Sequence, residues 1–124
     1  MRTVRVGVIK PEIFRQRMRD IATGKYKLTA DDPKIWFSSF KSCAELLCDN
    51  NIKLMNLIAT KKPESINALA ALSGRTQGNL SRTLHKLSDF KFIELIKDKN
   101  TIRPVAELVN YEIVINQAYL GIAI

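Results

Sequence analysis

The spacing of apolar residues between positions 65 and 87 predicts two consecutive helices. In the first, Ile66 and Leu69 fall on one side of the helix. In the second, helical spacing joins Leu80, Leu84 and Leu87. Each helix therefore has one apolar face, and we expect the two faces to pack together.

The residues that flank these helices indicate a tight turn between them. Gly74 tolerates the positive φ that such a turn requires, and Ala70 is small enough for a close helix crossing. Ser65 and Thr76 are suited to N-cap a helix, so they predict where the two helices begin. This layout is typical of a helix-turn-helix.

The outward face of the second helix is polar, and no acidic residue lies between Glu64 and Asp89. Base edges in a major groove require a mixture of donors and acceptors, and phosphates repel carboxylates. The face therefore suits DNA, although an ordinary helical hairpin with a solvated face is the alternative. Its residues are Gln77, Gly78, Asn79, Ser81, Arg82, His85 and Lys86.

A β-hairpin is predicted directly after this helix. Residues 93–97 and 101–105 read as two strands with a short polar turn between them. Lys97, Lys99 and Arg103 make the hairpin basic. A basic hairpin in this place is typical of the wing of a winged helix, which contacts the DNA backbone or the minor groove.

The N-terminal part of the chain predicts a strand, a helix and a second strand. Alternating valines indicate a strand over residues 3–9, and Pro11 and Gly24 delimit a helix. Residues 34–40 carry aromatic side chains on both faces, which predicts a strand covered on both sides.

Three arginines follow the polar side of that first helix. Arg15, Arg17 and Arg19 are expected to form a solvated face. An auxiliary phosphate contact is the alternative interpretation of the same residues.

The segment after the hairpin predicts one more strand and an apolar tail. Residues 111–115 alternate as a strand does, and we expect them to pair with 3–9 and 34–40 in a mixed sheet, within one chain or between two. The tail, residues 116–124, is apolar and is expected to bury against a partner subunit or a protein ligand.

Between these parts, the chain turns helical from Lys41. A further helix, capped by Asp49 or Asn50, would be the first of a three-helix core that ends in the wing. The predicted fold class is α+β: a winged helix-turn-helix, made of a three-helix core plus a β-hairpin wing, with an N-terminal strand-helix-strand extension. The predicted segments are 1–48 (extension for dimerisation or packing), 49–105 (winged helix-turn-helix) and 106–124 (strand and tail).

The charge of the chain favours polyanionic partners. The 124 residues carry a net charge of +8, of which residues 1–48 contribute +5 and residues 49–124 contribute +3. Because basic residues are shared between the two parts, some N-terminal residues are also candidates for phosphate contact. The same charge is found in RNA-binding proteins, so it does not by itself select DNA.

The sequence disfavours a metal site, a cofactor, catalysis and a membrane span. Cys43 and Cys48 lack the spacing of metal ligands, and the single histidine, His85, cannot complete a site, so no metal or cofactor is expected. Both cysteines read as reduced residues in or near the core of a cytoplasmic protein. No catalytic arrangement, phosphate-binding glycine loop or membrane span is apparent, so we expect neither an enzyme nor a membrane protein.

Residues 50–105 resemble the MarR-like winged helix-turn-helix of small prokaryotic transcriptional regulators. The segments PESINALAALSGRTQGNLSRTLHKL and DFKFIELIKDKNTIRPV carry this resemblance. Where the family usually has a glycine step into the wing, this chain has Lys91-Phe92-Ile93, so a less ideal helix end is expected. Through TVRVGVI, WFSSF and YEIVI, nearly the whole chain is also similar to small archaeal and bacterial DNA-binding regulators.

The sequence therefore predicts a transcriptional regulator that binds double-stranded DNA sequence-specifically as a homodimer. The recognition helix, residues 76–88, would enter the major groove, and the wing, residues 93–105, would follow the backbone. The candidate DNA-binding residues are Arg75, Thr76, Gln77, Asn79, Ser81, Arg82, His85, Lys86, Lys97, Lys99 and Arg103.

Two alternatives stay open. Some of the similar regulators look like antitoxins, which implies a protein that neutralises a toxin partner, through its N-terminal part or its tail, and autoregulates its own operon. RNA binding would instead require exposed stacking aromatics, for which residues 36–40 are the candidate.

Overall fold

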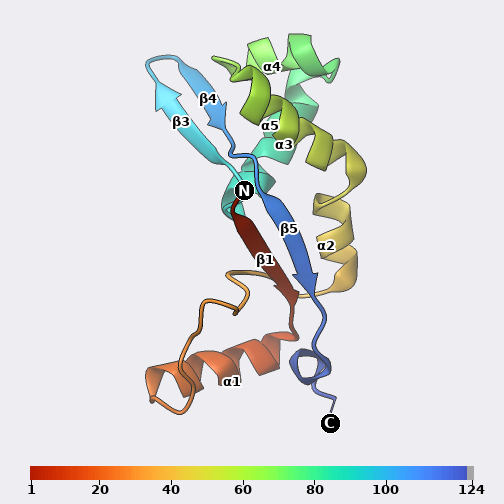
Figure 1. Cartoon of the computed structure of the whole chain (residues 1–124). Helices are drawn as coiled ribbons and strands as arrows, with labels where there is room; N and C mark the ends of the chain where they lie inside the picture. Colours follow the sequence, from red (N-terminus) through yellow and green to blue (C-terminus); the bar gives the residue numbers. More distant parts are fainter. Residues whose placement is uncertain (123–124) are drawn as a thin grey trace. The chain divides into compact units, whose positions relative to one another are not determined.

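The computed structural model of the chain describes residues 1–122, which form an α+β protein with five α-helices and two small sheets. The chain divides into two compact units (Figure 1). The first unit comprises Met1–Ala44 and Val109–Ile124, and the second comprises Glu45–Leu108. Both ends of the chain therefore belong to the same unit.

The first unit contains a three-stranded sheet of order β2-β1-β5. The central strand is β1 (Thr3–Val8), and it pairs with β2 (Ile35–Phe37) and β5 (Asn110–Val114). These are the segments predicted to pair, but the mixed sheet is wrong because both pairings are parallel. The intervening helix α1 (Pro11–Ala22) returns the chain to the starting end of β1, so β2 runs in the same direction.

The bounds of α1 follow from local signals, as predicted. Pro11 occupies the first turn, where a backbone N–H has no partner within the helix. At the other end, the N–H of Thr23 donates to the carbonyl of Arg19 at 3.0 Å. Gly24 then turns the chain away with a φ of +79°.

The strand predicted over residues 34–40 is shorter than expected. β2 ends at Phe37, and helix α2 (Phe40–Leu46) begins after only two intervening residues. The reason is a local capping bond: the Ser39 Oγ accepts from the N–H of Ser42 at 3.1 Å. This bond stabilises a helix start where the aromatic alternation alone indicates a strand.

Aromatic rings enclose the side chain of Arg17. Its guanidinium carbon lies 4.6 Å from the ring centroid of Tyr26, 5.1 Å from that of Trp36 and 5.7 Å from that of Tyr119. An oxygen of Asp32 lies 3.0 Å from Nη2, and the Arg17 side chain keeps only 11% of its exposure. We call these five residues the Arg17 cluster, which cation–π attraction and an ion pair stabilise.

The expected solvated arginine face is therefore wrong for Arg17 and correct for Arg15 and Arg19, which are exposed. Arg17 points into the unit because the rings of the cluster come from three separate segments that meet beside α1.

The ring of Trp36 occupies space that a glycine in the neighbouring strand leaves free. Gly7 is its register partner, and a Cβ on Gly7 would lie 2.7 Å from Cε3 of the Trp36 ring. The ring also meets Tyr119 edge-on, with centroids 5.0 Å apart. Tyr119 belongs to the short 3₁₀ helix η1 (Gln117–Leu120), and its carbonyl accepts from the N–H of Lys10 at 3.0 Å.

Tyr119 of the predicted tail therefore packs on its own unit, whereas Ile122 is 51% exposed. The expected burial of the tail against a partner stays a prediction. Residues 123–124, which the prediction also covered, lie outside the described part of the chain.

The second unit consists of three helices followed by a β-hairpin. The helices are α3 (Asp49–Lys61), α4 (Ile66–Ser73) and α5 (Gln77–Asp89). β3 (Glu94–Asp98) and β4 (Thr101–Val105) pair antiparallel. The N-cap of α3 is Cys48 rather than the predicted Asp49 or Asn50, and it makes no side-chain capping bond.

The core of the second unit is aliphatic. Leu69 from α4 and the leucines at 80, 84 and 87 from α5 are all 0% exposed, and Ile58 from α3 is 1% exposed. Burial of such side chains contributes about 1.5–3 kcal/mol each. The predicted apolar faces of the helices are confirmed.

Helix α5 ends on a lysine in the left-handed conformation. Lys91 has a φ of +69°, and its N–H donates to the carbonyl of Ser88 at 2.9 Å. The N–H of Phe92 donates to the carbonyl of Leu87, also at 2.9 Å. This is the Schellman arrangement of hydrogen bonds, formed without the glycine that usually permits it.

Lys91→Gly should therefore be more stable to urea than Lys91→Ala, by about 1 kcal/mol, because only glycine avoids the cost of left-handed backbone. Both substitutions remove the same charge, so the difference reports the backbone alone. At Lys86, inside α5, the same pair should show the opposite order by about 1 kcal/mol. Equal stability of the two Lys91 variants would contradict the assignment of strain.

The Arg17 cluster should make stability depend on pH. Hydrogen bonds from the Tyr26 hydroxyl and the Thr29 N–H, together with Arg17, lower the pKa of Asp32 from 3.8 to about 2. A lowered carboxyl pKa stabilises the fold fully above the unfolded value, and this contribution is lost as pH falls from 3.8 toward 2.

Asp32→Asn should flatten the fall of the melting temperature between pH 5 and about 2, relative to the unmodified chain. Thermal unfolding followed by circular dichroism measures this difference. Asp31→Asn, at the exposed neighbouring position, should keep the steep fall. An Asp32→Asn curve parallel to that of the unmodified chain would disprove the proposed role of the carboxylate.

Candidate nucleic-acid interface

Local hydrogen bonds and a glycine define where α4 begins and ends and where α5 begins. The Ser65 Oγ accepts from the N–H of Ala68 at 3.0 Å, and the Thr76 Oγ1 accepts from the N–H of Asn79 at 3.2 Å. Gly74 ends α4 with a φ of +73°. These bonds confirm the predicted caps and the predicted glycine turn.

Helix α5 is divided sharply into a buried and an exposed side. Leu80, Leu84 and Leu87 are completely buried. The predicted outward residues are exposed, except that Ser81 is half-buried. The exposed ones are Gln77, Gly78, Asn79, Arg82, His85 and Lys86.

A backbone contact sets the orientation of His85. Its Nδ1 lies 2.7 Å from the carbonyl oxygen of Ser81. Because a carbonyl only accepts, Nδ1 carries the proton, and Nε2 of the neutral ring is an acceptor. His85 can therefore offer an acceptor beyond the helix surface when neutral and a donor when protonated.

Arg75 differs from the other candidates because it is anchored within the unit. Its two terminal nitrogens both donate to Oδ1 of Asn51 at 3.3 Å. Asn51 is buried and donates from Nδ2 to the carbonyl of Leu46 at 2.9 Å. This chain of bonds ties the turn before α5 to the start of α3, a link between residues too far apart in sequence to predict.

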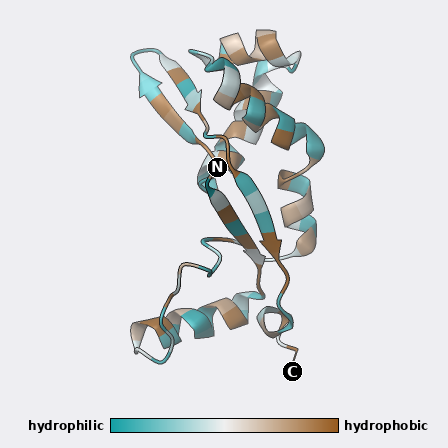
Figure 2. Cartoon of the chain, viewed as in Figure 1, coloured by the Kyte–Doolittle hydropathy of each residue, from teal (hydrophilic) through white to brown (hydrophobic). Residues whose placement is uncertain are grey.

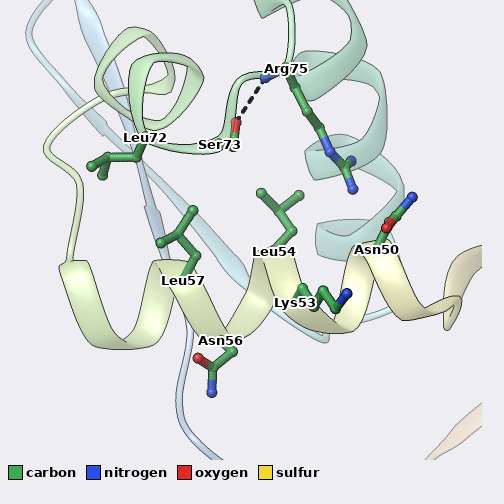
Figure 3. A pocket seen from close by; sticks show the side chains of 8 residues that line it. All are labelled: Asn50, Lys53, Leu54, Asn56, Leu57, Leu72, Ser73 and Arg75. Atoms are coloured by element: carbon green, nitrogen blue, oxygen red, sulfur yellow. Dashed lines mark hydrogen bonds between the residues drawn. The ribbon is translucent and has the colours of Figure 1, made fainter.

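A groove of about 500 Å³ lies beside this anchor, lined by residues of α3 and of the α4–α5 turn (Figure 3). Lys53 and Arg75 supply its positive charge, and no carboxylate lines it. Leu72, at the end of α4, is half-exposed along its wall. The anchored arginine thus faces an open, cationic surface at the N-terminal end of α5.

The three basic residues of the hairpin do not share one face. In the β3–β4 register, Arg103 is opposite Ile96, and Lys97 is opposite Ile102. Because neighbouring strand residues alternate, Lys97 and Arg103 project to opposite faces of the hairpin. Lys99 lies in the turn with a φ of +54°, and all three side chains are exposed. Figure 2 shows the tip of the hairpin at the hydrophilic end of the scale.

Thr76 also has a structural role, since its hydroxyl oxygen caps α5. Its hydroxyl proton is still able to donate.

The described residues offer little other chemistry. No group of three or more histidine, cysteine or acidic side chains gathers there in a way that could hold a metal ion. Cys43 and Cys48 are free, and burial raises the pKa of the Cys43 thiol. Within residues 1–122, we find no helix with the length and apolar character to cross a membrane.

Comparison with known proteins gives one match. The sequence model of a protein family named HVO_A0114 matches residues 46–114, which includes the helices α3, α4 and α5 and the hairpin. No curated protein and no solved structure matches the chain significantly.

The two glycines of the α4–α5 segment should respond oppositely to alanine. Gly78 is in the first turn of α5 with no atom within 4 Å of an added Cβ, so Gly78→Ala should raise the free energy of unfolding by about 0.5–1 kcal/mol. Gly74→Ala should lower it by about 1 kcal/mol, since its φ is +73°. Chemical denaturation measures both, and changes of the same sign would contradict the assigned backbone roles.

Proposed function

We propose that this chain, which belongs to the HVO_A0114 family, is a transcriptional regulator that binds double-stranded DNA sequence-specifically through α5. In this proposal α3, α4 and α5 with the β3–β4 hairpin form a MarR-like winged helix-turn-helix. Helix α5 is the recognition helix, and the hairpin is the wing.

The observation that carries the proposal is the exposed side of α5. Its leucine side is completely buried, so the opposite side is held toward solvent without freedom to rotate. That side offers amides, a guanidinium, an imidazole and an ammonium, and the sequence from residue 65 to residue 88 contains no carboxylate. A helix that approaches phosphates closely requires this combination.

Each exposed side chain suits a particular part of a duplex. Arg82 can bind the O6 and N7 atoms of a guanine with two hydrogen bonds, and Gln77 or Asn79 can do the same for adenine. Gly78 leaves the start of the helix without a side chain, so bases or phosphate can come close to its backbone. Ser81 and His85 can contact a base or a phosphate.

The remaining basic residues would contact the DNA backbone. Lys86 follows the base-reading residues on α5, and the hairpin presents Lys97, Lys99 and Arg103 on two faces. A wing whose opposite faces are both basic can lie within a groove between two phosphate strands. Arg75 would reach phosphate from its bond to Asn51 with the N–H groups that this bond leaves unused.

The antitoxin alternative has less support. It relied in part on an apolar tail available to a toxin, whereas Tyr119 packs on Trp36 within its own unit. RNA binding through the aromatics of residues 36–40 is also less favoured, because Phe37 is buried and Trp36 belongs to the Arg17 cluster, which leaves Phe40 as the one exposed ring.

Selection of bound duplexes from a random DNA pool, at low and moderate salt, tests the proposal directly. Recovery of a defined motif is the expected result. Recovery of unrelated sequences that all elute at moderate salt would reject sequence-specific binding.

Arg82→Ala should weaken binding to the selected duplex by about 1–3 kcal/mol and relax the preference at one base pair, because the residue reads a base edge. Lys99→Ala should instead weaken all duplexes alike and lower the salt slope by about one. Fluorescence anisotropy with the selected and a scrambled duplex measures both effects.

Arg15→Ala is the matched control, since Arg15 is an exposed arginine on α1, outside the proposed interface. It should leave the preference between the two duplexes unchanged. An equal loss on both duplexes for Arg82→Ala would remove Arg82 from the base-reading set.

A further inference from the structure

The sheet of the first unit has an edge to which another strand can be added. In the order β2-β1-β5, the described residues give β5 a neighbour on one side only. The N–H of Asn110 donates to the carbonyl of Arg2 at 2.9 Å, so Asn110 directs its backbone toward β1. Backbone direction alternates along a strand, so the N–H and C=O groups of Ile113 point toward the outer side.

The end of this strand and the residue that follows it are also apolar and exposed. Ile113 is 52% exposed and Ile115 is 69% exposed. Ile113 lies on the same face of the sheet as its register partner Val6, which is 0% exposed. The apolar layer of the sheet therefore continues outward onto β5 and is uncovered there. Figure 2 shows the C-terminal end of β5 at the hydrophobic end of the scale.

Natural proteins usually protect an edge strand with charge, proline, a bulge or short length. The opposite edge has such protection, because β2 contains three residues and follows Pro33 and Lys34. β5 contains five residues without proline. Its one charged side chain, Glu112, forms an ion pair with Arg5 on β1 at 3.3 Å. β5 is therefore the unprotected edge.

We propose that β5 pairs antiparallel with β5 of a second copy of the chain, which makes a continuous six-stranded sheet. The two-fold axis passes beside Ile113, so Ile113 is opposite its own equivalent. The outward N–H and C=O groups of the two Ile113 residues then face each other across the axis. Each N–H donates to the C=O of the other copy, which gives two backbone hydrogen bonds.

The register follows from side-chain chemistry. With Ile113 on the axis, Tyr111 is opposite Ile115 of the second copy, and Glu112 is opposite Val114. Apolar side chains then meet across the two strands on the face they share. A register centred on Glu112 would place two carboxylates opposite one another, which is unfavourable.

A second copy is the occupant that this edge fits best. The strand is complementary to itself in the antiparallel register, as a two-fold contact requires. The net charge of +8 is also kept away from the contact, because β5 carries only the paired Glu112. The use of such a dimer to present two α5 helices to a DNA site rests on the proposed function, but the pairing itself does not.

Sedimentation velocity of the full chain, without DNA and over a range of concentrations, tests the pairing. The expected result is a reversible change from 14.1 kDa to twice that mass. Ile113→Pro should raise the dimer dissociation constant at least tenfold without a change in the circular dichroism spectrum. Proline removes an N–H that points away from β1, so the internal sheet keeps its bonds.

Val114→Pro is the matched control, because the N–H at that position points toward β1 and its loss should unfold the first unit. Ile113→Lys provides a second test, since it places two cations at the axis and should also abolish the dimer. A chain that stays monomeric at every concentration would overturn the inference. So would a dimer that survives both substitutions at position 113.

Disulfide formation checks the register. Ile113→Cys should form a covalent dimer under mild oxidation, because residues in a hydrogen-bonded antiparallel pair lie within disulfide reach. Glu112→Cys should not, since it projects from the other face and is not opposite its own equivalent. Equal cross-linking at both positions would reject the register.

The dimer and the proposed function can fail separately. A chain that dimerises but shows no preference among DNA sequences would count against the proposed function alone. A chain that binds DNA selectively but stays monomeric would count against this inference alone.

Discussion

The burial of one leucine stripe determines what the second unit shows to solvent. Leu80, Leu84 and Leu87 lie on a single side of α5 and are completely buried. Rotation of the helix about its axis would expose these side chains, at a cost of about 1.5–3 kcal/mol for each. The direction of Gln77, Asn79 and Arg82 is therefore a consequence of core packing, because the helical repeat places them on the other side.

The ends of α5 are constrained as firmly as its rotation. A threonine cap and a glycine turn define its start, and the pair of hydrogen bonds through Lys91 and Phe92 defines its end. Asn51 further connects the turn to α3 through Arg75. The exposed side chains thus project from a rigid element, which is what recognition of a defined surface requires.

The first unit is stabilised differently. Its sheet has three strands, one of which contains only three residues, so aliphatic burial there is limited. The Arg17 cluster adds an enclosed cation with its carboxylate and three rings, and these residues extend in sequence from Arg17 to Tyr119. Gly7 makes room for Trp36, the ring that contacts both Tyr119 and Arg17. Polar and aromatic contacts therefore add to the burial of Val6, Val8, Ile9 and Ile35 in this unit.

The sequence predicted most features set by neighbouring residues and, among those set by distant ones, only which three strands pair. Ser65, Gly74 and Thr76 act within three or four residues, so the bounds of α4 and α5 and the buried leucines were predictable. The Ser39 capping bond is local as well, but the aromatic alternation of residues 34–40 masked it. The parallel sheet, the enclosure of Arg17 and the Arg75–Asn51 bond join distant segments, and no spacing in the sequence encodes them.

The pairing of Thr3 with Asn110 has a consequence for the order in which the protein is made. Residues 45–108 precede β5 in the chain, so they emerge from the ribosome before that strand does. The nascent chain can thus begin to form its helices and hairpin first, whereas β1 acquires its second neighbour only after β5 has emerged. Closure of this long-range contact is the slow step that we expect in the folding of the protein.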